Sequence, residues 1–227
     1  MNPNATHEPI IKIENLYKKY GDNVVLDGFN LNLYQGENLV IMGKSGSGKS
    51  VMIKCLIGLE IPDSGTIEIM SQKLEHLSLK ALDEIRADIG FLFQGSALYD
   101  SMTVRENLEF PLRRHISKFG NVKDTLPLVE EALQNVGLKN VIDLMPNELS
   151  RGMKRRVEVD RTRILKPKII IYDEPTTGLD PITSKEIILL MKSVQEKYKT
   201  SSIIITHDVD CARVIANRMI LLIDGKN

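Results

Sequence analysis

The residues with the clearest capacity for chemistry lie between positions 43 and 50, where GKSGSGKS fits the phosphate-binding pattern G-x-x-x-x-G-K-[ST]. The apolar residues 38–42 precede this loop as a buried strand would, and residues 51–57 can continue as a helix. In that context, glycines let backbone N–H groups turn inward around a polyphosphate, and the helix N-terminus adds positive charge. We therefore expect Lys49 to reach the terminal phosphates and the Ser50 hydroxyl to ligate Mg²⁺. The complete pattern in this context disfavours the alternative, a chance match in a surface turn.

Two acidic residues and a histidine follow other apolar runs. Residues 168–172 form an apolar run that ends in Asp173 and Glu174, and residues 202–206 form another that is followed by His207. The carboxyl ends of strands are where α/β sheets place ligands. We expect Asp173 to hold Mg²⁺ and Glu174 to polarise the attacking water. A lone histidine is usually structural, but the position of His207 favours a functional role.

The remaining pattern predicts an α/β fold with a helical insertion. Short strands are expected at residues 10–13, 31–33, 66–70, 89–93 and 219–223, and helices at residues 77–86, 124–136 and 184–198. Composition becomes helical near residue 95 and returns to strand-rich near residue 168. Tyr20 stands before a turn at residues 20–23, where it could stack on an adenine ring or be an ordinary strand aromatic; this local sequence supports both equally.

Composition narrows the class of protein. Thirty basic and thirty acidic residues in a chain of 227 cancel, which argues against a strongly basic nucleic-acid-binding domain. Cys55 and Cys211 lack metal-ligand spacing, so we expect two buried free thiols. No apolar run approaches about 20 residues, and residues 1–8 lack the apolar core of a signal peptide. We expect a cytosolic protein that can still bind a membrane protein.

Taken together and in this order, the motifs resemble those of the nucleotide-binding subunit of an ABC transporter, over nearly the whole chain. Gln94 is similar to the Q-loop glutamine, which contacts Mg²⁺ or water, and residues 149–153 (LSRGM) to the signature motif. The remaining site residues implied by the resemblance are the Walker A group Gly43, Lys44, Ser45, Gly46, Ser47, Gly48, Lys49, Ser50 and Val51, the Walker B residue Asp173, the base Glu174, the switch His207, the D-loop Asp180 and the adenine-stacking Tyr20.

The resemblance implies one nucleotide-binding domain over residues 1–227, a P-loop core of residues 1–94 and 168–227 with a helical subdomain of residues 95–167. It implies an ATPase that uses ATP and Mg²⁺ in a head-to-tail homodimer, where Ser150 and Gly152 face the partner's ATP. It also implies a membrane permease. We expect an exposed apolar patch, formed by Ala97, Leu98, Tyr99, Met102 and Val104, to receive that permease, with docking near Ala97, Leu98, Tyr99 and Met102. The alternative is that this loop folds back on its own helical subdomain.

Within the family, residues 92–99, 102–107 and 173–183, with the Gly-Met ending of the signature, are similar to the ATPases of Mla-type (Mce-associated) phospholipid transporters. This similarity implies lipid transport between the two membranes of a diderm bacterium, from the cytoplasmic face of the inner membrane, with an Mce-type substrate-binding partner. The alternatives are an importer or exporter ATPase for another cargo, a soluble ABC-type ATPase that acts on ribosomes or DNA, and a regulatory subunit that hydrolyses ATP poorly.

The chain departs from the family pattern at three places. Arg151 occupies the first signature glycine, and we expect nucleotide sandwiching to be retained. Asp160 lies on the apolar stripe of the helix that follows, with Arg156 and Arg163 close enough to pair with it. We expect a local ion pair that weakens packing under the signature loop, so that Asp160→Ala raises the melting temperature. Relatives carry more residues beyond Asn227, so we expect a truncated chain or the lack of a tail that contacts a neighbour.

Overall fold

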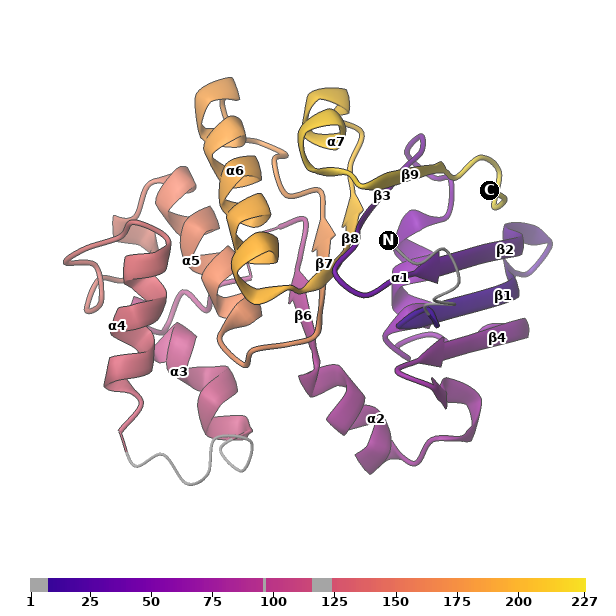
Figure 1. Cartoon of the computed structure of the whole chain (residues 1–227), viewed down its shortest axis with the longest axis horizontal. Coiled ribbons are helices and arrows are strands. Elements are labelled where there is room, and N and C mark those ends of the chain that lie inside the picture. Colours follow the sequence, from indigo (N-terminus) through magenta and orange to yellow (C-terminus); the bar gives the residue numbers. More distant parts are fainter. Residues whose placement is uncertain (1–7, 96, 116–123) are drawn as a thin grey trace, which may run out of the picture.

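Two sheets and a group of helices make up the structure, a computed structural model that describes residues 8–95, 97–115 and 124–227 (Figure 1). A five-stranded sheet in the order β6-β7-β8-β3-β9 runs through the middle, and every neighbouring pair in it is parallel. A four-stranded antiparallel sheet, β2-β1-β4-β5, lies at one end. The predicted α/β fold with an antiparallel N-terminal part is therefore confirmed.

The described elements agree with most of the predicted ones. The strands are β1 (Ile11–Tyr20), β2 (Asn23–Leu33), β3 (Asn38–Met42), β4 (Ser64–Ile69), β5 (Gln72–Lys73), β6 (Ile89–Leu92), β7 (Ile169–Asp173), β8 (Ser201–Ile205) and β9 (Arg218–Leu221). The helices are α1 (Lys49–Leu56), α2 (Leu79–Ala87), α3 (Val104–Arg114), α4 (Leu126–Asn135), α5 (Arg151–Arg163), α6 (Pro181–Tyr198) and α7 (Val209–Ile215), with 3₁₀ turns at Leu74–His76 and Pro146–Glu148.

The first two strands are longer than the short strands predicted there. They form one antiparallel pair across the turn at Gly21, and its register shifts at several points along β1. Charged residues such as Lys18 and Lys19 interrupt the apolar alternation in the sequence, which hid the continuous strand. The backbone ladder tolerates those side chains because one face of the pair points to solvent.

The inner strands β3, β7 and β8 of the central sheet are buried on both faces, so they are mainly apolar, whereas the edge strand β9 is partly exposed. In β3, Leu39 and Ile41 enter a cluster with α1 and the antiparallel sheet, whereas Val40 enters a cluster with α6 and α7. This alternation follows from the two-residue period of a strand. The carboxyl ends of β3, β6, β7 and β8 all open toward the same edge, because the strands are parallel.

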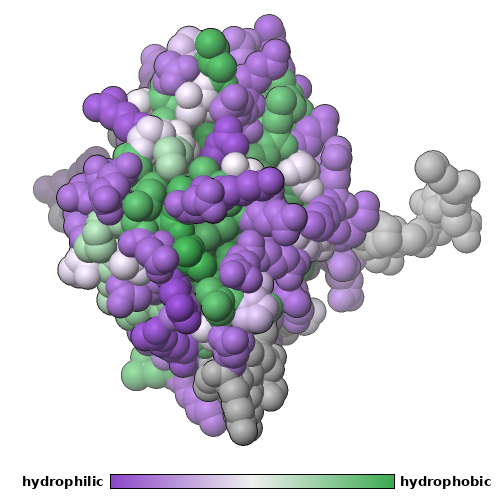
Figure 2. All heavy atoms as spheres, turned by 90° about the vertical axis from the view of Figure 1, so that its left-hand side faces the viewer, coloured by the Kyte–Doolittle hydropathy of each residue, from purple (hydrophilic) through white to green (hydrophobic). Residues whose placement is uncertain are grey.

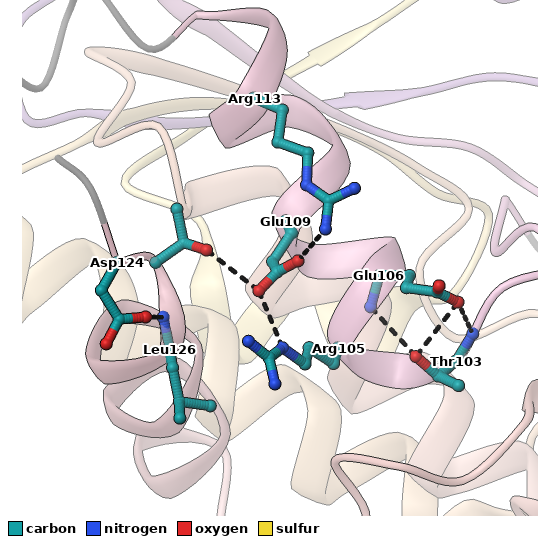
Figure 3. Close-up of polar contacts among 8 residues, drawn as sticks. Thr103, Arg105, Glu106, Glu109, Arg113, Asp124 and Leu126 are labelled. Atoms are coloured by element: carbon teal, nitrogen blue, oxygen red, sulfur yellow. Dashed lines mark hydrogen bonds and ion pairs between the residues drawn. The ribbon is translucent and has the colours of Figure 1, made fainter. Parts of the chain in front are cut away.

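A third apolar cluster holds α3, α4 and α5 together at the other end of the molecule. Figure 2 faces this end and shows hydrophobic atoms between hydrophilic ones near its centre. Thr103 begins α3 with a capping box: its hydroxyl accepts from the Glu106 backbone N–H, and the Glu106 carboxylate accepts from the Thr103 N–H (Figure 3). No described helix is both long and apolar enough to cross a membrane.

The prediction that residues 97–104 form an exposed apolar patch is partly wrong. Leu98 is 7% exposed and Val104 is fully buried, because both side chains enter the helical cluster. Tyr99 is 45% exposed, but its ring packs on Phe110 and under Arg161. The loop thus folds back on its own helices, as the alternative expected, and leaves mainly Tyr99 at the surface.

The predicted burial of the two cysteines and of Asp160 is confirmed. Cys55 and Cys211 are buried free thiols in different clusters. Asp160 is fully buried and pairs with Arg163, whereas Arg156, the other predicted partner, turns outward to Glu186. The helix α5 approaches the sheet closely at Gly90 of β6. A Cβ at this position would lie 2.2 Å from the Thr162 carbonyl oxygen, so the approach requires a glycine.

Candidate functional site

The loop between β3 and α1 is shaped by its glycines and by Lys49. Gly48 adopts φ +105° at the start of α1, and a Cβ there would lie 2.7 Å from the Val25 carbonyl oxygen. A larger residue would therefore meet both backbone strain and a clash. The Lys49 ammonium donates to the carbonyls of Gly43 at 2.7 Å and Lys44 at 2.8 Å, which closes the loop into a ring around the lysine.

A cavity of about 590 Å³ opens above this loop. It brings together residues from the carboxyl ends of four strands, β3, β6, β7 and β8, and from the start of α1. Its lining comprises Val25, Gly43, Lys44, Ser45, Gly46, Gly48, Lys49, Ser50, Val51, Gln94, Asp173, Glu174 and His207. The structure thus collects in one cavity the predicted catalytic residues and most of the predicted phosphate-binding residues, although Gly43 and His207 lie 164 positions apart in the sequence.

Glu174 is fixed in an unusual backbone conformation directly after β7. Its φ is +49°, its N–H donates to the Ile205 carbonyl at 2.9 Å, and the residue is 8% exposed. One carboxylate oxygen lies 2.8 Å from His207 Nδ1 and accepts from the Thr177 hydroxyl at 3.2 Å. A buried carboxylate held by two side chains at a cavity wall has the geometry of a base that orients water.

Asp173, the last residue of β7, lies next to it and is partly buried. Burial raises the pKa of the Asp173 carboxyl and the neighbouring Glu174 carboxylate raises it further, while Lys49 and Arg155 oppose both effects. With the Ser50 hydroxyl and the Gln94 amide, it presents oxygen donors around one cavity. That donor set fits Mg²⁺, which takes one or two carboxylates together with phosphate and water oxygens.

The predicted signature and D-loop residues lie outside this cavity. Ser150 caps α5 by accepting from the Met153 N–H, and Asp180 caps α6 by accepting from the N–H groups of Ile182 and Thr183. Gly152 faces α6, since a Cβ there would lie 2.9 Å from the Thr183 methyl. Within one chain these residues therefore serve as helix caps and a close contact, and none of them meets the phosphate loop.

Two more predicted residues are also not among the residues that line the cavity. Tyr20 is 44% exposed at the end of β1, with the Lys18 ammonium over its ring. Ser47 is 8% exposed, and its hydroxyl finds no hydrogen-bond partner among the described residues. An orphaned buried hydroxyl inside a phosphate-binding loop fits an acceptor-rich ligand there.

Sequence reasoning missed three residues that shape the site. Val25 lines the cavity from β2, Thr177 holds the Glu174 carboxylate, and Arg155 donates to the Glu174 carbonyl at 2.9 Å. Thr177 lies within residues 173–183, which resemble the family's sequences, and could have been found there. Val25 and Arg155 reach the site only through tertiary contacts, for which the sequence carries no local signal.

Comparison with known proteins agrees with this geometry. A family model described as "ABC transporter" matches residues 26–177. An intermembrane phospholipid transport system ATP-binding protein, MlaF, of Haemophilus influenzae is 37% identical over 220 residues, which cover 97% of this chain and 83% of the relative. A methionine import ATP-binding protein of Clostridium tetani is 36% identical over 219 residues, which cover 96% of this chain and 67% of the relative. The chain spans 60% of the methionine import protein of Brucella abortus.

Solved structures show the same fold. A bacterial ABC transporter cassette solved as a dimer superposes with a TM-score of 0.84 at 36% identity, over 95% of both chains. A dimeric post-hydrolysis state of an ATP-binding cassette bound to ADP and phosphate superposes with a TM-score of 0.83 at 35% identity, also over 95% of both chains. The chain therefore belongs to the ABC transporter family, as one of its ATP-binding, ATP-hydrolysing domains.

Proposed function

We propose that this chain powers phospholipid transport between the two membranes of a diderm bacterium, from the cytoplasmic face of the inner membrane and through a permease partner. The observation that carries its ATPase role is the single cavity that contains the loop around Lys49, the Asp173–Glu174 pair and His207. The similarity to the phospholipid transport protein of Haemophilus influenzae supports the cargo. Methionine import is the second candidate, because relatives with that description are almost as similar.

In the proposed mechanism, the N–H groups of residues 43–51 and the Lys49 ammonium bind the phosphates of ATP. Ser50, Asp173 and Gln94 would hold Mg²⁺, which would neutralise charge that develops on the phosphates. Glu174 polarises the attacking water, and His207 orients the Glu174 carboxylate through their 2.8 Å contact. Tyr20 stacks on the adenine.

Two copies of the chain complete the proposed site. Ser150 and Gly152 lie outside the cavity, so they can face the ATP of a second copy in a head-to-tail homodimer, with Asp180 at the same interface. The dimeric cassettes among the solved relatives support this arrangement. ATP binding closes the dimer and hydrolysis reopens it, a population shift between two states.

The permease is proposed to bind beside Gln94. Phe93, just before Gln94, is 48% exposed and lines a groove of about 510 Å³ together with Phe91 and Leu59. We place an apolar helix of the permease in this groove and keep Tyr99, the exposed residue of the predicted patch, as a further contact. Tyr99→Glu is expected to abolish permease binding and spare folding, whereas Leu98→Glu, first suggested by the sequence, would disrupt the helical cluster.

The ATPase site is tested by hydrolysis and gel filtration of the purified chain. Glu174→Gln is expected to lower turnover by roughly a hundredfold or more and to form an ATP-dependent dimer. Glu130→Gln, an exposed acid on α4, serves as the matched control and should leave turnover unchanged. Full turnover in Glu174→Gln would contradict the assignment of the base.

The cargo is tested with the chain purified together with its membrane partners and reconstituted in proteoliposomes. ATP-dependent transfer of labelled phospholipid, absent in Glu174→Gln, would support the proposal; an Mce-type protein among the partners would add to it. ATP-dependent uptake of labelled methionine without lipid transfer would overturn the proposed cargo and favour the second candidate.

A further inference from the structure

A buried ion pair in α5 lies directly behind the candidate site. Arg155 is 5% exposed and Glu158 is 4% exposed, and Arg155 Nη1 lies 2.9 Å from Glu158 Oε2. Charged side chains are seldom buried to this degree unless paired and hydrogen-bonded. The remaining N–H donors of the Arg155 guanidinium therefore need acceptors of their own.

The guanidinium donates to three backbone carbonyls from two separate segments. Nε donates to Pro175 at 2.8 Å, Nη2 to Glu174 at 2.9 Å, and Nη1 to Phe93 at 3.0 Å. Two of these acceptors form the turn that carries the candidate base, and the third precedes Gln94. A planar guanidinium can serve such divergent acceptors at once, which a lysine ammonium cannot do in the same geometry.

The carboxylate partner extends the same contact. Glu158 Oε1 accepts from the Ala97 N–H at 3.2 Å. Gln94 thus lies between two backbone positions, Phe93 and Ala97, that are both anchored on this ion pair. The ion pair therefore contacts the backbone on both sides of Gln94, whose side chain lines the cavity.

Glu174 depends on such support because of its backbone. A φ of +49° is disfavoured for a residue with a Cβ and persists only where the surroundings enforce it. Its N–H is held by the Ile205 carbonyl, and its own carbonyl by Arg155. Loss of the Arg155 contacts would free the carbonyl side of this residue and let its carboxylate turn away from His207.

We propose that Arg155, with Glu158, is a positioning residue for ATP hydrolysis that sets both the Glu174 carboxylate and Gln94. Because Arg155 lies in the second turn of α5, it also links the helix capped by Ser150 to the catalytic turn. Arg155 does not line the 590 Å³ cavity, so its contribution is to turnover and not to nucleotide affinity. This inference rests on the proposed role of Glu174 as the base.

The test compares Arg155→Lys and Arg155→Gln with wild type for kcat, KM and the Kd of ATP. We expect kcat to fall at least about tenfold in both variants while the Kd of ATP stays within about threefold of the wild-type value. Compared with Arg155→Gln, Arg155→Lys should recover more of the melting temperature than of kcat. The matched control is Arg156→Gln on the same helix, which pairs outward with Glu186 and should keep kcat within about twofold.

A double variant tests whether Arg155 acts through Glu174. In the Glu174→Gln background, Arg155→Lys should lower the residual turnover by clearly less than the roughly tenfold expected in wild type, because one of the two groups it positions, the Glu174 carboxylate, is already gone. Fully additive losses in the double variant would overturn the inference. An unchanged kcat in Arg155→Lys would overturn it as well. If Arg155→Gln fails to fold, Arg155→Lys alone still provides the test. Turnover that survives Glu174→Gln alone would instead overturn the proposed base.

Discussion

Two buried carboxylates in the helical part of the molecule have opposite surroundings. Glu109 of α3 is 2% exposed and accepts from Arg105 at 2.8 Å, from the Thr125 hydroxyl at 2.9 Å and from Arg113 (Figure 3). Burial acts to raise the pKa of Glu109, but these hydrogen bonds outweigh it and lower that pKa. Its charge is therefore stabilised by the fold.

Asp160 of α5 is fully buried with fewer contacts. Its Oδ1 lies 2.5 Å from Arg163 Nη2, yet neither carboxylate oxygen accepts a well-oriented hydrogen bond from a described residue. Burial raises the pKa of Asp160 to about 6, and the attraction to Arg163 offsets only part of that rise. Arg163 also borders a cavity of about 350 Å³ with Tyr198 and Thr200, whose hydroxyls find no partner among the described residues.

The comparison shows that an ion pair in a helix stabilises a buried charge only when the other lone pairs are also satisfied. Both carboxylates have an arginine three or four positions away. The difference is the Thr125 hydroxyl and the second arginine at Glu109.

The largest expected effect is that of Glu109→Gln. The glutamine side chain has only one acceptor oxygen, which is neutral, so it cannot accept from Arg105, Arg113 and Thr125 together. We therefore expect a loss of about 3 kcal/mol in the free energy of unfolding, from two charge-assisted hydrogen bonds. For a chain of this length that lowers the melting temperature by roughly 6–12 °C. Chemical denaturation of the variant beside wild type measures it, and a change below about 1 kcal/mol would remove the proposed contrast.

Asp160→Asn should have the opposite sign. The difference between a pKa of about 6 and the ordinary value near 3.8 corresponds to roughly 2–3 kcal/mol of lost stability at neutral pH, which the neutral amide avoids. We expect about 2 kcal/mol of stabilisation, and Asp160→Ala should also raise the melting temperature. Arg163 lines the 350 Å³ cavity together with Glu131, Tyr198 and Thr200, so polar groups border the same cavity when Asp160 is replaced by a neutral residue. A lower melting temperature in both variants would show that the Asp160–Arg163 pair is stabilising.

The two sites should also differ in pH dependence. Because the pKa of Asp160 is raised on folding, its cost is absent below pH of about 4 and complete above about 6. The gain from Asp160→Asn should therefore shrink to less than half by pH 4.5. The pKa of Glu109 is lowered, so its contribution persists at pH 4.5 and is lost only at lower pH. Denaturation curves of both variants at pH 7.5 and 4.5 separate these cases, and parallel shifts would contradict the assignment.

The smallest effect is expected for Arg156→Gln. Arg156 lies 2.7 Å from Glu186, but the two side chains are 29% and 51% exposed. Solvent screens such a pair, so the loss should be below about 1 kcal/mol. Repeating the measurement at high salt provides the control, since a loss that remains as large would point to the Arg156 contact with the Val136 carbonyl instead.

Much of the candidate site could be predicted from the sequence. The loop around Lys49, the acids after β7 and the histidine after β8 are local patterns, because a parallel sheet brings the ends of its strands to one edge whatever the details of packing. Helical periodicity placed Asp160 in the core in a similar way, because it determines which face of α5 is buried.

The tertiary structure decided what each buried or half-buried side chain meets. Leu98 and Tyr99 are neighbours in an apolar run, yet one enters the helical cluster and the other remains exposed. Arg155 and Arg156 are adjacent and of the same type, yet Arg155 donates to the Glu174 carbonyl, whereas Arg156 pairs with Glu186 at the surface. Sequence fixes residue type, spacing and the face of a helix, whereas hydrogen-bond partners come from segments brought together by folding. The charge state of Asp160 and the setting of Glu174 therefore depend on the packed structure.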